Sequence, residues 1–309
     1  MKHILFLGTP AFAVPSLQAL AKDERFEIVG VVTQPDKPVG RKGTLTAPPI
    51  KIAAQELGIK TIKQPQKLID KDFRSWIEEI GPTCDAFIVV AYGKIFREWF
   101  LKLPKNGLIN VHASLLPRWR GASPINAVIA AGDKKSGVCI MEIQEEMDAG
   151  GVYACAETEI TDQDTAETLH DRLAQMGADL LPNTVFDILE NDLKPIPQDD
   201  TKATYCKTLT REDGKIDWSK DAIEIECLLR AYTPWPGIWT EIDGKRVKII
   251  RASISDQIND LAPSSIFKTE SDEMAIACGN QTALIIESLQ PEGKQAMDGR
   301  AFLNGRKSR

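Results

Sequence analysis

The order of elements near the N-terminus constrains the fold more than any other feature of the chain. Residues 3–8 form a short apolar run, residues 11–21 carry apolar side chains at helical spacing, and residues 26–33 form a second apolar run. A strand, a helix and a second strand in this order predict a right-handed βαβ unit, which builds a parallel sheet. Residues 85–92 are apolar without alternation, as is typical of a parallel strand buried on both faces. We therefore predict an α/β domain with an open parallel sheet.

The turn after the first predicted strand excludes one large class of ligands. Residues 8–13 read Gly-Thr-Pro-Ala-Phe-Ala and lack the second and third glycines of a dinucleotide-binding fingerprint. Those glycines let the backbone approach a pyrophosphate and let the helix pack closely on the strand. The sequence therefore argues against a dinucleotide cofactor, and the prediction of an open α/β sheet is unaffected.

The composition is that of a globular protein with room for two domains. The chain has 309 residues, of which 43% are hydrophobic and 27% charged. No apolar run approaches the roughly 18 residues of a membrane span, and the first apolar run lacks the cleavage pattern of a signal peptide. We expect a cytoplasmic monomer without membrane contact. The net charge of −6 argues against a generic nucleic-acid binder and leaves room for local basic patches.

The cysteines predict neither a metal site nor a disulfide framework. No two of them stand in a C-x-x-C arrangement, and most lie inside apolar runs. The six are Cys84, Cys139, Cys155, Cys206, Cys227 and Cys278. We interpret them as reduced, buried thiols of a cytoplasmic protein and expect no metal.

Residues 193–206 mark the predicted boundary between two domains. The segment begins with a polar stretch that contains two prolines, which is typical of a linker. Beyond it, residues 207–309 contain one helical pattern and several short β-rich runs separated by Gly, Asn and Asp. That spacing predicts a small barrel, and barrels of the OB type often bind nucleic acids. We predict an α/β domain over residues 1–192 and a barrel domain over residues 207–309.

Residues 34–49 form a long connection that reads QPDKPVGRKGTLTAPP. A connection of this length without structure of its own is usually functional or disordered. Its cationic side chains Lys37, Arg41 and Lys42 suit contact with a phosphate backbone. A solvated, flexible loop is the alternative, and the residues alone leave both open.

Two polar residues stand at the end of the strand predicted over residues 108–112. Asn110 and His112 are two residues apart, so their side chains should project from the same face. The strand over residues 85–92 should end at the same edge, where open α/β sheets bind ligands. Asp148, in an acidic turn, supplies the carboxylate that we expect at this edge, because the small residues 149–151 beside it would let a substrate approach the backbone. The alternative is a capped strand end together with a solvated acidic turn.

An amide, an imidazole and a carboxylate suit acyl or formyl transfer to an amine. The attacking amine creates an oxyanion, which a preorganised donor stabilises by about 3 kcal/mol. A histidine with an ordinary pKa near ~6.5 moves protons in both directions at neutral pH. No Ser or Cys lies in a nucleophile elbow, so we expect direct transfer without a covalent enzyme intermediate.

Several motifs resemble those of a known enzyme family. They read FLGTP at residues 6–10, TQPDKP at 33–38, VVAYG at 89–93, NVHASLLPRWRGASPI at 110–125, MDAG at 147–150 and PWPG at 234–237. Together they resemble the 10-formyltetrahydrofolate-dependent formyltransferases, and among these the methionyl-tRNA formyltransferase family, over nearly the whole chain. The departures are mild, because Ala113 and Ser123 carry no reacting group.

The resemblance implies a fold and a reaction. It implies a Rossmann-like N-terminal domain, an OB-like C-terminal domain that binds tRNA, and a basic loop, residues 34–49, that touches the acceptor stem. The reaction it implies is transfer of a formyl group from 10-formyltetrahydrofolate to the methionine amine of initiator methionyl-tRNA, which supplies translation initiation.

The resemblance also implies roles for particular residues. Asn110 would polarise the formyl oxygen, His112 would move the proton and stabilise the oxyanion, and Asp148 would tune His112 and help to deprotonate the amine. The tRNA contacts would include Arg41, with Lys37 and Lys42 beside it. The folate site would consist of Val89, Val90, Ala91, Tyr92, Gly93, Ser114, Leu115, Leu116 and Pro117.

Two rival hypotheses compete with this interpretation. One is a related formyltransferase that acts on a sugar-nucleotide or glycinamide amine, and the basic loop argues against it. The other is a catalytically silent folate- or RNA-binding protein on the same scaffold, and the intact set of amide, imidazole and carboxylate argues against that.

Overall fold

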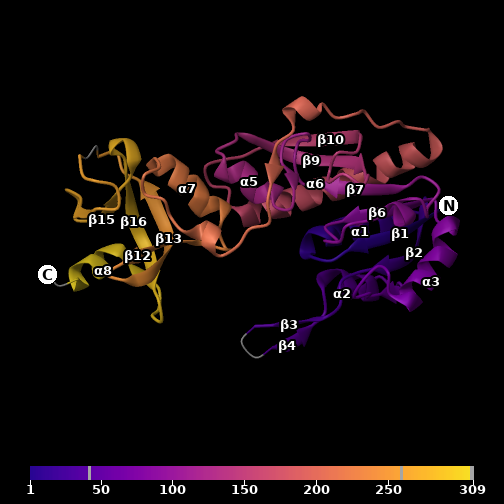
Figure 1. The fold of residues 1–309 in the computed structure, drawn as a ribbon, viewed down its shortest axis with the longest axis horizontal. Coiled ribbons are helices and arrows are strands. Elements are labelled where there is room, and N and C mark those ends of the chain that lie inside the picture. The colour runs from indigo at the N-terminus through magenta and orange to yellow at the C-terminus, as the bar shows by residue number, and fades with distance from the viewer. Residues whose placement is uncertain (41–42, 258–259, 307–309) are drawn as a thin grey trace. The chain divides into compact units, whose positions relative to one another are not determined.

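The computed structural model describes residues 1–40, 43–257 and 260–306 (Figure 1). Its contacts divide the chain into two compact units. The first unit comprises residues 1–121, 135–159 and 170–206, and the second comprises residues 122–134, 160–169 and 207–309. All the predicted catalytic and folate-binding residues belong to the first unit.

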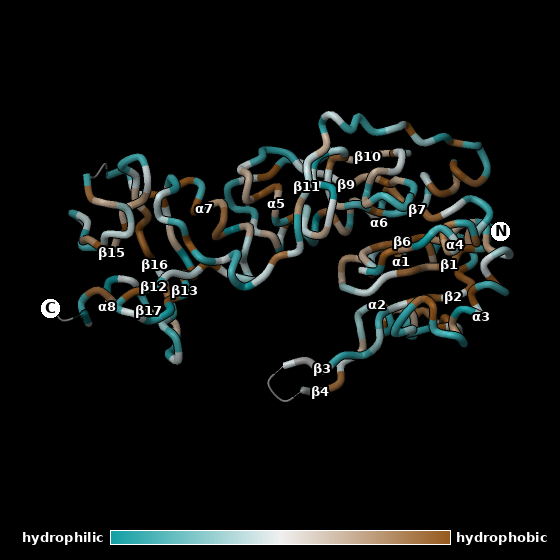
Figure 2. Tube along the Cα trace, in the orientation of Figure 1, coloured by the Kyte–Doolittle hydropathy of each residue, from teal (hydrophilic) through white to brown (hydrophobic). Residues whose placement is uncertain are grey.

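A seven-stranded sheet forms the centre of the first unit, and Figure 2 shows the apolar residues gathered along its strands. The strands, in spatial order, are β10 (Val152–Glu159), β9 (Lys135–Glu142), β7 (Leu108–His112), β6 (Ala86–Val90), β1 (Lys2–Gly8), β2 (Phe26–Val32) and β5 (Ile62–Lys63). The α/β fold class is confirmed. The sheet is mixed, however, because β9 runs antiparallel to both β7 and β10. β9 and β10 are joined by residues 143–151, a connection shorter than the crossover that parallel strands need.

Helices cover this sheet where the sequence shows helical apolar spacing. They are η1 (Ala11–Ala13), α1 (Val14–Lys22), α2 (Pro49–Glu56), α3 (Lys71–Ile80), η2 (Gly81–Thr83), α4 (Glu98–Leu101) and α6 (Ala166–Glu190). Pro182 lies inside α6 without ending it. Proline removes one backbone donor, and the buried Leu181 and Val185 beside it keep that face of the helix packed in the core.

The basic connection is a β-hairpin, so the prediction of a structureless loop is wrong. β3 (Lys37–Val39) pairs antiparallel with β4 (Thr44–Thr46). Figure 1 shows the hairpin extending away from the seven-stranded sheet. All three residues of β4 are exposed. The hairpin is therefore held by backbone hydrogen bonds and not by a core of its own.

The segment predicted as a linker packs along the first unit. Ile196 forms an isolated antiparallel bridge with Val152, and η3 (Asp200–Lys202) follows. β11 (Tyr205–Cys206) then pairs in parallel with β8 (Arg120–Gly121). Residues 193–206 are thus fixed against the part of the chain that carries the Arg-Trp-Arg-Gly motif.

The second unit is built around a six-stranded antiparallel sheet. Its strands follow the order β12 (Ile238–Ile242), β13 (Lys245–Ile254), β16 (Ala283–Pro291), β15 (Met274–Ala277) and β14 (Ile266–Lys268), with β17 (Met297–Asp298) paired to β16. Its helices are α5 (Pro124–Ala130), η4 (Glu212–Gly214), α7 (Ala222–Ala231), η5 (Gly279–Gln281) and α8 (Gly299–Gly305). Within the described residues β12 and β14 are not paired with each other, so this is an open half-barrel of the kind predicted.

Two cysteines correct the prediction of reduced, buried thiols. Cys139 and Cys155 face each other across β9 and β10 and form a disulfide. Cys155 is exposed and Cys206 is half-buried, whereas the other free cysteines are buried. The error arises because sequence spacing does not reveal the register that makes two residues direct cross-strand neighbours.

None of the described helices combines the length and the apolar character that a membrane crossing requires.

Candidate active site

The strand ends of the first unit bring Asn110, His112 and residues 91–93 to one edge of the sheet. In β7, Asn110 lies opposite Val89 of β6, and His112 lies opposite Cys139 of β9. β6 ends two residues before Tyr92, so residues 91–93 follow its carboxyl end. The edge predicted from alternation and strand order is therefore the edge that the structure forms.

His112 is almost fully buried and has two fixed neighbours. Its Nε2 lies 3.0 Å from the carbonyl oxygen of Trp119, and its Nδ1 lies 3.7 Å from Oδ2 of Asp148. A carbonyl oxygen only accepts, so Nε2 donates and carries a proton. The other ring nitrogen, Nδ1, is the one that faces Asp148.

Asp148 lies in the turn between β9 and β10 with its backbone in the left-handed region, at φ 52°. Aspartate adopts this conformation more readily than most residues. Its Oδ2 accepts a hydrogen bond of 2.8 Å from the backbone N–H of Gly121. The same carboxylate oxygen therefore contacts the loop on one side and faces His112 on the other.

Asn110 is half-buried, and among the described residues its side-chain amide has no hydrogen-bond partner. An amide offers both donors and an acceptor. Its N–H groups are therefore available to an oxygen atom of a bound molecule at this edge.

The active-site loop, residues 114–121, is tied down along its length. Ser114 Oγ donates to the carbonyl of Arg118 at 2.6 Å, and Trp119 N–H donates to Thr204 Oγ1 at 2.9 Å. Gly121 has φ 116°, and a Cβ there would lie 2.1 Å from the carbonyl oxygen of Cys206. Only glycine fits this position, because the paired strand β11 leaves no space for a side chain.

Arg120 organises a polar network that the sequence does not indicate. It is fully buried, and its guanidinium donates to Gln198 Oε1 at 3.1 and 3.0 Å and to Asp200 Oδ1 at 2.7 Å. Tyr205 Oη lies 3.4 Å away. Burial opposes the charge, but the bonds to Asp200 and Tyr205 outweigh it and raise the pKa of Arg120 above its ordinary value. Two arginines in one short motif are the only hint in the sequence.

Gly150 and Gly151, which follow Asp148, allow the chain to pack closely and do not open space for a substrate. The sequence suggests that small residues there let a substrate approach the backbone. In the structure, a Cβ on Gly150 would lie 2.1 Å from the carbonyl oxygen of Glu142, and one on Gly151 would lie 2.7 Å from Cβ of Pro195. Both positions are filled by the chain itself, which corrects that interpretation.

The residues assigned to folate fall into an accessible and a buried group. Ala91 and Gly93 are exposed, and residues 115–117 are half-buried. The buried group consists of Val89, Val90, Tyr92 and Ser114. The Tyr92 hydroxyl has no hydrogen-bond partner in the described structure, and burial raises its pKa. Any flat ligand at this edge would therefore lie against the accessible group.

The residues assigned to tRNA are only partly described. Lys37 is exposed on β3, whereas Arg41 and Lys42 lie outside the described residues. At the base of the hairpin, Asp36 accepts hydrogen bonds from Lys51 Nζ at 2.8 Å and from Gln64 Nε2 at 2.7 Å. These contacts lower the pKa of Asp36, the bond from Gln64 most of all.

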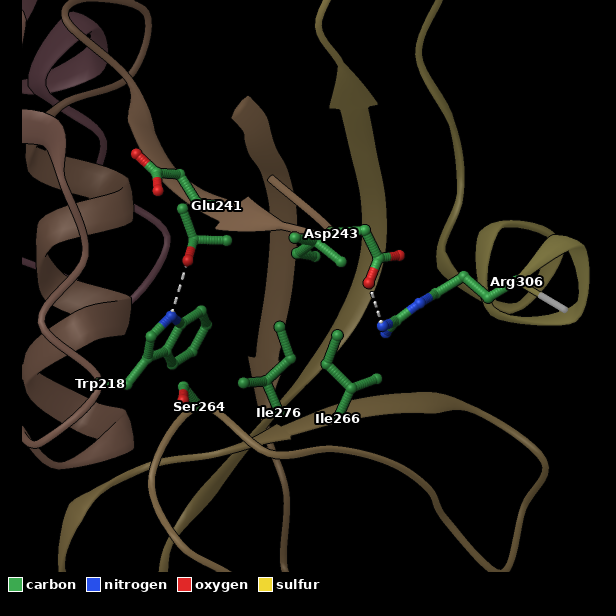
Figure 3. Close-up of a pocket in the computed structure, with 9 residues that line it drawn as sticks. Trp218, Glu241, Asp243, Ser264, Ile266, Ile276 and Arg306 are labelled. Carbon is green, nitrogen blue, oxygen red and sulfur yellow. Dashed lines mark hydrogen bonds and ion pairs between the residues drawn. The ribbon is translucent and has the colours of Figure 1, made fainter. Parts of the chain in front are cut away.

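A hollow of about 290 Å³ lies in the second unit, between β12 and β14, which are not paired with each other in the described structure (Figure 3). Trp218 Nε1 donates to Thr240 Oγ1 within it, and Arg306 is paired with Asp243 at 2.8 Å. None of the predicted site residues lines it. Over the described part of the chain, no group of three or more His, Cys, Asp or Glu is arranged to hold a metal ion.

Comparison with known proteins places the chain among formyl-transferring enzymes. The family model described as formyl transferase matches residues 1–185, and the model of the formyl transferase C-terminal domain matches residues 208–307. A methionyl-tRNA formyltransferase of Bacillus velezensis is 42% identical over 99% of this chain and 95% of its own. Another, from Geobacillus thermodenitrificans, is 42% identical over 100% of this chain and 96% of its own.

Solved structures share the fold at lower identity. An N-formyltransferase from Helicobacter canadensis, in complex with folinic acid and dTDP-3-aminofucose, superposes with a TM-score of 0.69. It is 19% identical and covers 94% of this chain and 100% of its own. At this identity the likeness extends to the fold alone.

Proposed function

Because the chain belongs to the formyl transferase family, we propose that Asn110, His112 and Asp148 are the groups that carry out formyl transfer. The chain is a formyltransferase that acts on the methionine amine of initiator methionyl-tRNA and gives N-formylmethionyl-tRNA, as its full-length relatives do. The observation that supports the assignment of residues is the pairing of His112 with a backbone carbonyl at Nε2 and with Asp148 at Nδ1.

The formyl donor is derived from folate, in keeping with the family and with the folate-bound relatives of the fold. We propose 10-formyltetrahydrofolate as the donor, with its ring system against residues 89–93 and residues 114–117. The exposed Ala91 and Gly93 and the half-buried Leu115, Leu116 and Pro117 support this placement, because folate-sized ligands need apolar walls with few polar groups.

Each of the three residues has a distinct task in this proposal. As the amine nitrogen bonds to the formyl carbon, Asn110 donates a hydrogen bond to the oxygen that gains charge. His112 accepts at Nδ1 the proton that the amine loses and passes it to the folate nitrogen as its bond to carbon breaks. Asp148 stabilises the imidazolium that exists between these two steps. The Trp119 carbonyl holds the imidazole in the tautomer that this requires.

Recognition of the tRNA is assigned to the hairpin and to the C-terminal domain. Lys37, with Arg41 and Lys42, supplies cations for the phosphate backbone. The matches of the two family models to residues 1–185 and 208–307 support the proposed domain boundaries 1–192 and 207–309. We also propose that the protein is a cytoplasmic monomer.

One assay tests the function. The protein is mixed with 10-formyltetrahydrofolate and, separately, with charged initiator tRNA, charged elongator tRNA and an amino-sugar nucleotide, and the formylated amine is measured. We expect formylation of the initiator tRNA above both others. Preferential formylation of the amino sugar would contradict the tRNA assignment and favour the first rival.

A further inference from the structure

We propose that Gln198 is a positioning residue for Asp148, so that the segment between the two domains helps to build the active site. The inference rests on the proposed function, because it assigns Gln198 to the reaction that Asp148 serves. It is carried by a chain of hydrogen bonds from Arg120 through Gln198 to the turn between β9 and β10.

The amide of Gln198 joins two parts of the first unit. Its Nε2 donates to the backbone carbonyls of Asp148 and Gly150, each at 2.7 Å. Its Oε1 accepts from Nε and Nη2 of Arg120 at 3.1 and 3.0 Å. Carbonyls only accept and a guanidinium only donates, so the amide has one possible orientation and every contact fits it.

The turn that Gln198 holds needs support. Asp148 is a non-glycine residue at φ 52°, a conformation that persists when surrounding contacts determine it. Two contacts do so here, because Gln198 binds the backbone carbonyl of Asp148 and Gly121 N–H binds its carboxylate. Gly121 directly follows Arg120, so both contacts trace back to the same short strand, β8.

Arg120 keeps Gln198 in place. Its guanidinium is fully buried, and a buried charge needs hydrogen bonds to all sides. Gln198 Oε1 supplies two of these bonds and Asp200 supplies another. The pairing of β11 with β8 fixes the backbone on both sides of this network. Gln198 is therefore anchored at the oxygen and supports the turn with its nitrogen.

Gln198 should affect the reaction by fixing the position of Asp148 relative to His112. Asp148 Oδ2 lies 3.7 Å from His112 Nδ1, beyond the usual range of a direct hydrogen bond, so a small displacement of the turn changes how the pair handles a proton. A misplacement of about 1 Å in a catalytic group can cost about 100-fold in rate. Within the described structure the hydrogen bonds of the Gln198 side chain go to the backbone of the turn and to the guanidinium of Arg120, so its effect should reach the reaction through Asp148.

The first experiment compares Gln198→Met, which keeps the length and removes every hydrogen bond, with Gln198→Glu, which keeps an acceptor for Arg120 and removes the N–H donors. We expect kcat for initiator methionyl-tRNA to fall roughly 10- to 100-fold in both, while KM for each substrate changes less than about 3-fold. Gln175→Met, on the exposed face of α6, is the matched control and should match the wild type. An unchanged kcat in Gln198→Met would overturn the proposal.

The second experiment separates positioning from a general structural role. In an Asp148→Asn background, Gln198→Met should lower kcat by no more than about 2-fold, because groups that act as one unit are not additive. Independent, multiplied effects would show that Gln198 does not act through Asp148.

A third measurement needs no activity. Gln198→Met should speed hydrogen exchange in the peptide covering residues 144–151 and leave β1 unchanged. Unchanged exchange in that peptide overturns the inference even if the enzyme formylates tRNA. Faster exchange in a protein that formylates no tRNA would instead count against the proposed function alone.

Discussion

The active-site loop and the β3–β4 hairpin are both basic connections of the first unit, but they are held very differently. The loop, residues 114–121, is tied to the segment 193–206 by backbone pairing, by Thr204 and by the buried Arg120. The hairpin has an exposed outer strand, and in the described structure its side-chain anchors lie at its base, at Asp36. One connection is part of the core, and the other projects from it.

This difference follows from what each connection has to do. A group that stabilises a reacting centre must be in place before the reaction, because reorganising it would cost part of the catalytic gain. A group that meets a phosphate backbone acts through a long-range field and gains from reach. We therefore expect changes in the loop and its neighbours to alter kcat or stability, and changes in the hairpin to alter binding of tRNA.

The largest effect is expected at His112. His112→Ala removes the imidazole that faces Asp148, and we expect kcat to fall by about 1,000-fold with little change in folate affinity. Steady-state formylation and equilibrium folate binding measure the two. His3→Ala, at an exposed histidine paired with Glu27, is the control. A His112→Ala enzyme with a normal rate would remove the basis of the proposed mechanism.

The next largest expected effect is on the free energy of unfolding of the first unit, through β9, the neighbour of the strand β7 that carries Asn110 and His112. The disulfide between Cys139 and Cys155 closes a loop with a sequence separation of 16 and joins the two strands that carry the Asp148 turn. Cys155→Ser should lower the free energy of unfolding of the first unit by up to about 3 kcal/mol. Denaturant unfolding with and without a dithiol reductant measures this. Reductant should bring the wild type to the level of the variant and leave the variant unchanged.

A smaller effect is expected in the hairpin. Lys37→Ala removes one exposed cation, so KM for the tRNA should rise several-fold with kcat unchanged. The slope of the logarithm of the binding constant against the logarithm of the salt concentration should become shallower by about 0.7 to 0.9. Lys22→Ala, at the exposed end of α1, is the matched control. If Lys37→Ala lowered kcat and left the salt dependence intact, the contrast between the two connections would be wrong.

Much of the frame of the site could be predicted from the sequence. Buried parallel strands are continuous apolar runs, so β1 and β6 are visible without a structure. The spacing of Asn110 and His112 within a strand places both on one face, because side chains alternate. The carboxyl ends of parallel strands lie at the same edge of a sheet, and open α/β sheets bind ligands there. The position of the candidate site follows from this rule.

The support of the site could not be predicted in this way. Arg120 and Gln198 are 78 residues apart, and neither belongs to a periodic pattern that points to the other. Arginine is rarely buried, so sequence reasoning leaves Arg120 in solvent and the following segment as a linker. The disulfide depends on the register of β9 and β10, and a shift of one residue would put its two sulfurs on opposite faces.

The smallest effect should appear at the base of the hairpin and should depend on pH. Hydrogen bonds from Gln64 and Lys51 lower the pKa of Asp36, so the carboxylate form is favoured in the folded state. Its anchoring is complete above the ordinary aspartate pKa of about 3.9 and is lost as the pH falls through the lowered value. Hydrogen exchange in β3 should therefore be unaffected by Asp36 between pH 7 and pH 5. Asp36→Asn at pH 7 removes the charge directly, and we expect KM for the tRNA to rise less than about 3-fold, since an ion pair that solvent still reaches, as this half-buried one is, contributes little. A large loss of kcat in this variant would mean that the hairpin, like the active-site loop, has to be held rigidly for the reaction.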